Sequence, residues 1–190
     1  MKFTKVEVAT RQLNTAIKLF FNAGDVVSIH TLAAASATVF ADLLEKAGQT
    51  SWRQMIVEDN HDLTVTQVFD VLRNAQNFFK HADRDHEEIL EFPETDNDAV
   101  IFIATLEYGL LLQNKNQKSG EQEKLSTPAS VFQLWHFATK LGDSYIPETP
   151  LAVAIDLFPG IKARPRFEQL SMGATILRKR EVYNRNPQAS

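Results

Sequence analysis

The side chains best suited to chemistry gather in one stretch of this 190-residue chain, from residue 73 to residue 86. The stretch reads Arg-Asn-Ala-Gln-Asn-Phe-Phe-Lys-His-Ala-Asp-Arg-Asp-His. A guanidinium stabilises anionic charge, an amide makes directional hydrogen bonds, and an imidazole exchanges protons near neutral pH. Arg73, Asn77 and His81 are therefore the candidate catalytic residues.

These three residues lie on a predicted helix. The spacing of apolar residues predicts a helix over about residues 65–82, which begins after a capping box at residues 64–67. At about 100° per residue, Arg73, Asn77 and His81 share one face, opposite an apolar stripe that includes Phe79. We call this face the polar ridge. Arg73 and His81 are about 12 Å apart along the axis, so only neighbouring pairs can touch. An ordinary solvated helix face is the alternative interpretation.

A helix that carries Arg, then Asn, then a His near its end resembles the HEPN superfamily of helical domains. Many members of that superfamily cleave or process RNA, and others are non-catalytic. The resemblance implies a cleft at a symmetric dimer interface, lined by Arg and His of two subunits, in which cleavage needs no metal. Seven residues separate Arg73 from His81, a longer spacing than is usual in the family.

The resemblance also implies roles for individual residues. Arg73 would stabilise phosphate charge, and His81 would assist proton transfer at a ribose 2′-hydroxyl. Asn77 lies between them, and Lys80 and Arg84 are the candidate RNA-binding residues. The first functional hypothesis is therefore RNA binding or metal-independent RNA cleavage by a homodimer.

The end of the same stretch also has the residue types of a metal site. His81, Asp83, Asp85 and His86 place two imidazoles and two carboxylates within six residues, a set that suits a divalent ion. The spacing matches no standard metal-binding motif, and Arg84 would oppose the ion. A metal-dependent helical enzyme is therefore a separate hypothesis.

A second metal interpretation concerns the interior of the protein. His30, Glu107 and His136 fall on three helices that we expect to be buried, which is the general plan of metal sites in helical bundles. A lone buried histidine is more often a core residue, whereas an unpaired buried carboxylate is costly. We therefore expect Glu107 to have a partner (His30, His136, Arg73 or Tyr108) or to reach solvent.

Composition narrows the class of protein. Hydrophobic residues make up 44% of the chain, so we expect a globular protein. The absence of cysteine excludes disulfides, thiolate metal sites and cysteine nucleophiles. Glycines occur singly and form no phosphate-binding loop, so we predict no cofactor. The apolar run at residues 100–112 is too short to span a bilayer and no signal peptide is seen, so we predict a cytoplasmic protein that does not bind membranes.

The net charge of −4 is unevenly distributed. Residues 161–190 contain seven Lys/Arg and two Asp/Glu, which gives +5, so residues 1–160 carry −9. The acidic body argues against binding to DNA and against general nucleic-acid affinity. We expect the basic segment to dock on the acidic body of its own chain or of a partner subunit, with contact to RNA as the alternative.

Glycine, proline and capping residues divide the chain into helices, and no strand rhythm is seen, so the predicted fold class is all-α. We expect a helical bundle of about five or six helices over residues 1–142 and a C-terminal extension over residues 143–190, packed on the bundle, with a loose basic tail from residue 184. Besides the helix at 65–82, the predicted helices cover residues 5–23, 25–46, a short helix from the capping box at 51–54, 97–113, 127–141, 149–158 and 166–181. Between them we expect an acidic loop at residues 83–98 and an exposed polar loop at residues 114–126.

The acidic loop leads to the remaining hypothesis, a non-catalytic helical module that binds another protein. In it, the polar ridge and the acidic loop would form the binding surface. RNA and protein are therefore both candidate partners of the chain.

Overall fold

A computed structural model describes residues 1–59, 74–81, 87–120, 122–140 and 150–185 of the chain. Every regular element in them is helical, which confirms the all-α prediction. Residues 74–80 are helical, within the helix predicted at 65–82. The other elements are α1 (Lys5–Phe21), α2 (Val26–Lys46), α3 (Trp52–Asp59), α5 (Asp96–Ser119), α6 (Thr127–Lys140), α7 (Pro150–Leu157), the 3₁₀ turn η1 (Ile161–Ala163) and α8 (Arg166–Arg185).

Capping side chains fix where the first three helices begin. Thr4 and Glu7 form a capping box, in which the Thr4 amide donates to Glu7 Oε2 at 2.7 Å and the Glu7 amide donates to Thr4 Oγ1 at 3.2 Å. Asp25 accepts from the Ser28 amide at 2.7 Å at the start of α2. The Ser51 amide donates to Gln54 Oε1 at 3.0 Å before α3. These caps satisfy amides that have no partner inside their helices, so the local sequence determines the boundaries.

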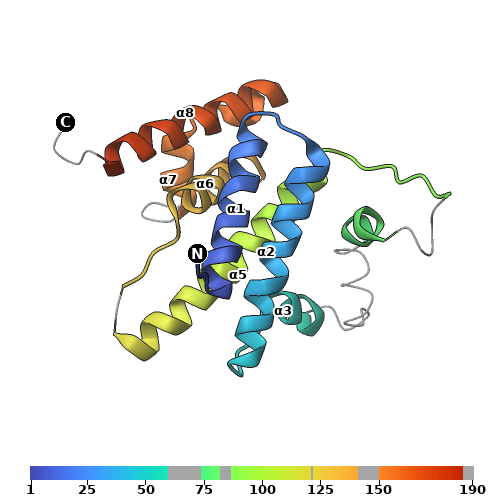
Figure 1. The fold of residues 1–190 in the computed structure, drawn as a ribbon. Helices are drawn as coiled ribbons and strands as arrows, with labels where there is room; N and C mark the ends of the chain where they lie inside the picture. Colours follow the sequence, from blue (N-terminus) through green and yellow to red (C-terminus); the bar gives the residue numbers. More distant parts are fainter. Residues whose placement is uncertain (60–73, 82–86, 121, 141–149, 186–190) are drawn as a thin grey trace.

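The centre of the bundle is α2, which packs most extensively against α1 and α5 (Figure 1). Small residues make this close packing feasible, since Ala33, Ala34 and Ser36 are buried along α2. By length and composition α2 could also cross a membrane, a property that the sequence analysis overlooked. In the structure, 39% of the most apolar stretch of α2 is buried.

An aromatic cluster joins α1 to α6. Phe20 lies 5.3 Å from Phe132 and 5.2 Å from Trp135, ring centre to ring centre, and Phe21 lies 5.8 Å from Trp135. Most of these rings meet edge to face, which adds to the free energy of burial. The Trp135 indole N–H donates to the Gln169 carbonyl of α8 at 2.8 Å, so the cluster also holds the C-terminal helix.

The start of α8 is held by an ion pair with Asp98 at the start of α5. The Asp98 side chain is 3% exposed, and Arg166 Nη1 donates to its Oδ2 at 3.0 Å while Nη2 contacts its Oδ1. Lys140 Nζ lies 3.2 Å from the same carboxylate. The Arg166 guanidinium stacks over the rings of Phe20 and Trp135 at 5.1 and 5.2 Å. The basic C-terminal segment therefore docks on the acidic body of its own chain at this end of α8.

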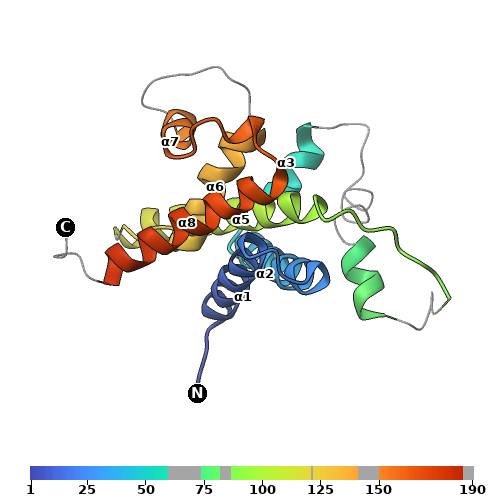
Figure 2. The same ribbon diagram turned by 90° about the horizontal axis from the view of Figure 1, so that it is seen from above.

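Seen from above, α8 crosses α5 and α6, while α1 and α2 lie on the opposite side of α5 from α7 (Figure 2). At Gly173, α8 approaches α1 so closely that an added Cβ would overlap the ring of Phe21. Glycine is required here by the close approach of the neighbouring helix, since the backbone at Gly173 is ordinary helix.

Two helices are longer than predicted. Residues 114–119, expected in a polar loop, continue α5 to Ser119, where Gly120 ends it in the left-handed conformation (φ 72°). Asn184 and Arg185, expected in a loose tail, are helical and complete α8. In both cases a polar sequence was mistaken for a loop, because an exposed helical turn needs no apolar residues.

Gly173 and Gly109 provide a matched pair of substitutions. We expect Gly173→Ala to lower the free energy of unfolding by about 1–3 kcal/mol, because the added Cβ would displace the Phe21 ring, which is buried against Phe132 and Trp135. Gly109→Ala should instead raise it by about 0.5–1 kcal/mol, because no atom lies within 4 Å of the added Cβ and alanine favours helix. Urea denaturation of both variants measures the difference. Equal stabilities would contradict the close approach of α8 to α1 at Gly173.

Candidate functional site

The described part of the polar ridge faces outward. Asn77, Lys80 and His81 are all exposed, and Asn74 is exposed beside them. The His81 amide donates to the Asn77 carbonyl at 3.0 Å, so these two residues lie one helical turn apart on neighbouring positions of one face. The prediction that Asn77 and His81 share an outward face is therefore confirmed.

Three aromatic rings hold this helix against α2. The ring of His30 on α2 lies 5.7 Å from Phe79 and 5.0 Å from Phe92, and Phe79 lies 5.5 Å from Phe92. All three pairs meet edge to face. Gln76 is also buried. The inward side of residues 74–80 therefore anchors the segment on α2, and its polar side, with Asn77 and His81, is exposed to solvent.

Several predicted site residues lie outside the described residues. They are Arg73, which would bind phosphate, Arg84, which would contact RNA, and the metal-ligand candidates Asp83, Asp85 and His86. Of the predicted sites, the structure places Asn77, Lys80 and His81. That Arg73 shares the face of Asn77 and His81 remains a prediction from the sequence.

His30, which the sequence analysis considered as a ligand, is a core residue. It is 5% exposed, and neither ring nitrogen forms a hydrogen bond to a described residue. Asn97 of α5 lies close enough to favour the charged imidazole, but its Oδ1 is also unpaired among the described residues, so the approach falls short of a hydrogen bond. Burial outweighs this effect and lowers the pKa of His30, so the ring is neutral at pH 7.

Glu107 has a different partner from those expected. Its carboxylate accepts hydrogen bonds from the backbone amides of Trp52 and Arg53, at 3.0 and 3.1 Å. It therefore caps α3 from a neighbouring helix, a tertiary contact that local sequence patterns do not contain. Burial raises the pKa of Glu107, and the two amides and the nearby Arg53 partly offset this. The expectation of a partner is confirmed, but His30, His136 and Tyr108 are not that partner; Arg73, also named for it, lies outside the described residues.

The interior histidine on α6 is also accounted for by packing. His136 stacks on Phe102 with ring centres 4.0 Å apart and planes 8° apart. Burial, with a smaller effect of Lys140, lowers the pKa of His136 to about 4, although Asp98 opposes the shift. His30, Glu107 and His136 therefore contact different neighbours. In the parts of the chain that the structure describes, no three His, Asp or Glu side chains are grouped as metal ligands.

An acidic arm follows the ridge. It covers residues 87–94 and runs as an extended segment back to the start of α5 (Figure 1). Glu88, Glu91 and Glu94 are exposed on it, and Ile89 is 92% exposed. The arm therefore presents an apolar side chain and several carboxylates to solvent.

The C-terminal half of α8 presents the opposite charge, on what we call the basic face. It consists of the exposed side chains Arg178, Lys179, Arg180 and Arg185, together with Val182 and Tyr183, which are 63% and 54% exposed. Glu181, between them, pairs with Lys18 of α1 at 2.8 Å. None of the four cations forms an ion pair with a described residue. The end of α8 is still held on its own chain by Glu181 and by Asn184, whose side-chain amide donates to Thr127 Oγ1 at 2.8 Å, so the basic face is the exposed side of a docked helix.

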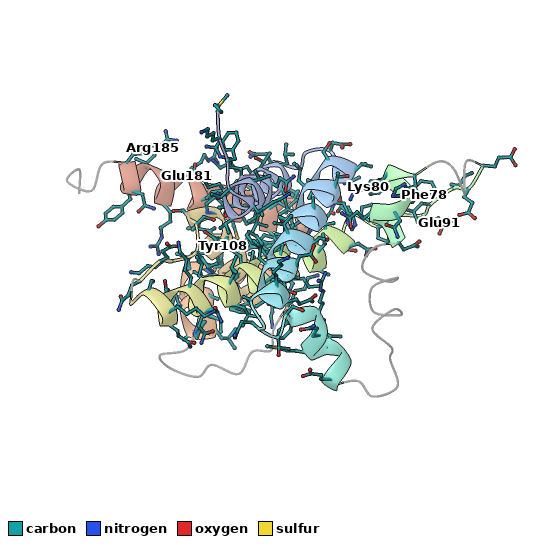
Figure 3. The ribbon with its side chains drawn as sticks, turned by 60° about the horizontal axis from the view of Figure 1, so that its bottom comes forward. Phe78, Lys80, Glu91, Tyr108, Glu181 and Arg185 are labelled. Atoms are coloured by element: carbon teal, nitrogen blue, oxygen red, sulfur yellow. The ribbon has the colours of Figure 1, made fainter. Side chains whose placement is uncertain are left out.

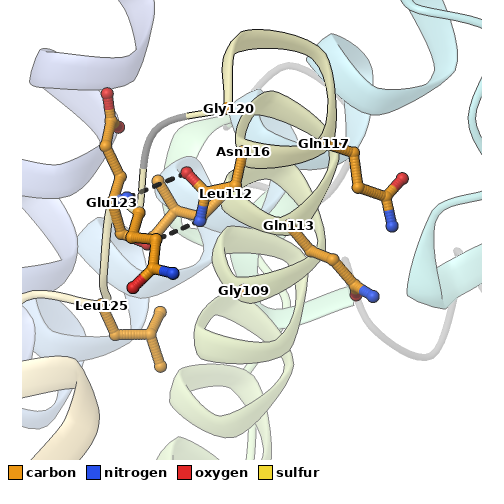
Figure 4. Close-up of a pocket in the computed structure, with 9 residues that line it drawn as sticks. Gly109, Leu112, Gln113, Asn116, Gln117, Gly120, Glu123 and Leu125 are labelled. Atoms are coloured by element: carbon orange, nitrogen blue, oxygen red, sulfur yellow. Dashed lines mark hydrogen bonds between the residues drawn. The ribbon is translucent and has the colours of Figure 1, made fainter.

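A hollow of about 520 Å³ beside the end of α5 was not anticipated (Figure 4). Its lining is mainly amide and apolar, with Gln113, Gln117 and Leu112 among its residues. Asn116 fixes one wall, because its side chain exchanges two hydrogen bonds with the backbone of Glu123, at 2.8 and 2.9 Å. The sequence analysis missed this hollow because it assigned residues 114–126 to a loop.

Comparisons with known proteins leave the family of this chain open. No protein-family model matches it, and neither a curated protein nor a solved structure is significantly similar to it. The resemblance to HEPN domains therefore rests on the residues of the polar ridge alone.

His136 makes stability depend on pH. Its folded pKa of about 4 lies below the ordinary 6.5, so between these values the unfolded chain binds a proton that the folded chain does not, and stability falls as pH falls. Replacing His136 with Phe keeps the stack on Phe102 and removes this proton. We expect the loss of stability between pH 7 and 4.5 to be smaller in His136→Phe by on the order of 1–2 kcal/mol. Urea denaturation at the two pH values measures it, and equal losses in both proteins would contradict the burial of the ring.

Proposed function

We propose that this protein is a non-catalytic helical interaction module whose acidic arm binds another protein. The observation that carries the proposal is the exposure of Ile89, at 92%, between exposed glutamates on an extended segment. An apolar residue of this kind gains free energy on burial at an interface, and the surrounding carboxylates select a basic partner. The three rings of His30, Phe79 and Phe92 support the function, because they hold the base of the arm on the bundle.

The charge of this region favours protein over nucleic acid. Lys80 and His81 are followed in the chain by the acidic arm, and residues 1–160 carry −9. A polyanion would be repelled by this region, whereas a basic protein surface would be attracted. The proposal includes a homodimer and a cytoplasmic location as further expectations from the sequence.

A photo-crosslinking residue at position 89 tests this proposal. Introduced in place of Ile89 in the producing cells, it should form a covalent adduct with a protein, because the side chain projects toward the partner. The adduct should be lost when Glu88 and Glu91 are both changed to Lys, since the attraction is then reversed.

The same crosslinker at Val153 provides the control, because Val153 is an exposed apolar residue (49%) on α7, away from the arm. Equal adducts at both positions, or none at position 89, would count against an interaction site on the arm.

RNA cleavage of the HEPN type is the second candidate function. It is favoured by the exposure of Asn77 and His81 one turn apart on one face. In this case a second copy would bring its own ridge opposite the first, and Arg73 and His81 of both copies would line the cleft.

Cleavage of labelled RNA without metal tests this second function. His81→Ala and Arg73→Ala should each lower the rate by at least about 100-fold, because they remove proton transfer and charge stabilisation. Gln117→Ala, which changes an exposed amide on α5, should leave the rate unchanged. Cleavage that persists in both ridge variants, or none in the wild-type protein, would reject this function.

A further inference from the structure

The acidic arm and the basic face lie at opposite ends of the molecule. Figure 3 places Lys80 and Glu91 at one end and Arg185 at the other. The two surfaces are opposite in charge, and each carries exposed apolar side chains: Ile89 on the arm, and Val182 with Tyr183 on the basic face. Because they are so far apart in one molecule, they can meet only between two molecules.

The dimensions of the two surfaces also agree. The arm from Glu88 to Glu91 covers three residue steps, which is about 10 Å of extended chain. The basic face from Arg178 to Arg185 covers seven steps of helix, which is also about 10 Å. Residues 89 and 91 point to the same side of an extended chain, so a strand laid along this helix can place Glu91 next to an arginine while Ile89 contacts Val182 or Tyr183.

We propose that the basic face of α8 is the docking site for the acidic arm of a second copy of this chain. The inference rests on the proposed function, because it names the partner of the arm. The contact joins two different surfaces: made twice between two antiparallel copies it closes a homodimer, and repeated head to tail it gives a larger ring or an open chain of molecules. It is distinct from the symmetric contact between ridges that a HEPN-type dimer would use.

A second surface, an apolar groove near α1, could also receive the arm, but its charge makes it a poorer docking site than the basic face. A groove of about 770 Å³ between α1 and α5 has Tyr108 and Leu111 in its lining, and Arg11 and Lys118 among its charged residues. It also contains Glu7 and Glu123, so its cations are largely balanced. On the basic face the one acid, Glu181, is already paired with Lys18, and four cations remain.

A charge exchange between two variants tests the inference. The face variant carries Arg178→Glu, Lys179→Glu and Arg180→Glu, and the arm variant carries Glu88→Lys, Glu91→Lys and Glu94→Lys. Each variant alone opposes like charges at the contact, so its dissociation constant for self-association should rise at least about tenfold in sedimentation velocity. An equimolar mixture should associate again, because the acidic arm of the first meets the basic face of the second, and the basic arm of the second meets the acidic face of the first. Association in the mixture also shows that both variants are folded.

The matched control changes the same amount of charge elsewhere. Lys2→Glu, Lys5→Glu and Lys118→Glu together alter exposed lysines away from α8 and should leave self-association of the purified protein nearly unchanged. Wild-type association should also weaken as ionic strength rises. A wild-type protein that is monomeric at low ionic strength, or a mixture that stays monomeric, would overturn the inference.

The crosslink from position 89 separates this inference from the proposed function. An adduct that joins the arm to the α8 peptide of a second copy supports both. An adduct with a different protein supports the proposed function and overturns the docking of two copies. Binding of single-stranded RNA by the basic face, with no self-association, would overturn the inference and assign the four cations to phosphate contacts.

Discussion

The buried carboxylate of Asp98 is the constraint on which the packing of the C-terminal half depends. A charge that is 3% exposed must be compensated, and Arg166 and Lys140 do this from two other helices. The guanidinium of Arg166 is sandwiched against Phe20 and Trp135 in turn. One carboxylate thereby sets the relative positions of α1, α5, α6 and α8. Apolar burial alone tolerates sliding of one helix past another, whereas a paired and stacked guanidinium does not.

This constraint divides the basic segment into two parts with different roles. The beginning of the segment forms ion pairs within the fold, since Arg166 neutralises Asp98 and Arg164 pairs with Glu168. Its end remains exposed as the basic face, with Glu181 neutralised by Lys18. Ion pairs within the chain therefore neutralise only part of the positive charge that lies after residue 160. The remaining cations make one end of the molecule basic, opposite the end with the acidic arm.

The sequence predicted what depends on local patterns and missed what depends on tertiary contacts. The caps at Thr4, Asp25 and Ser51 are local, and the corresponding helices begin where expected. Glu107 shows the limit, because its partners are backbone amides some 54 and 55 residues away that no spacing rule indicates. The end of α5 was missed because residues 114–119 are exposed and polar, so they lack the apolar periodicity that identifies a helix.

For the candidate site, the outward direction of Asn77 and His81 could be predicted, because a helical period and one apolar face determine it. The sequence places Ile89 in an acidic loop, and its exposure could not be predicted, because an isoleucine is more often buried than exposed. The exposure of the basic face could not be predicted, since it depends on which side of α8 packs on the bundle. That side is fixed by tertiary contacts such as those of Glu181 with Lys18 and of Asn184 with Thr127, which are distant in sequence.

The ring contacts of His30, Phe79 and Phe92 are also the place where the helix at residues 74–80 can separate from α2 by local unfolding. They are edge contacts between three partly separate elements, whereas α2 shares a continuous interface with α1 and α5. Local unfolding that breaks three ring contacts requires less free energy than separating the central helices. Backbone amides of residues 74–80 should therefore exchange hydrogen with solvent far sooner than those of α2, and the two ends of the molecule differ in rigidity as well as in charge.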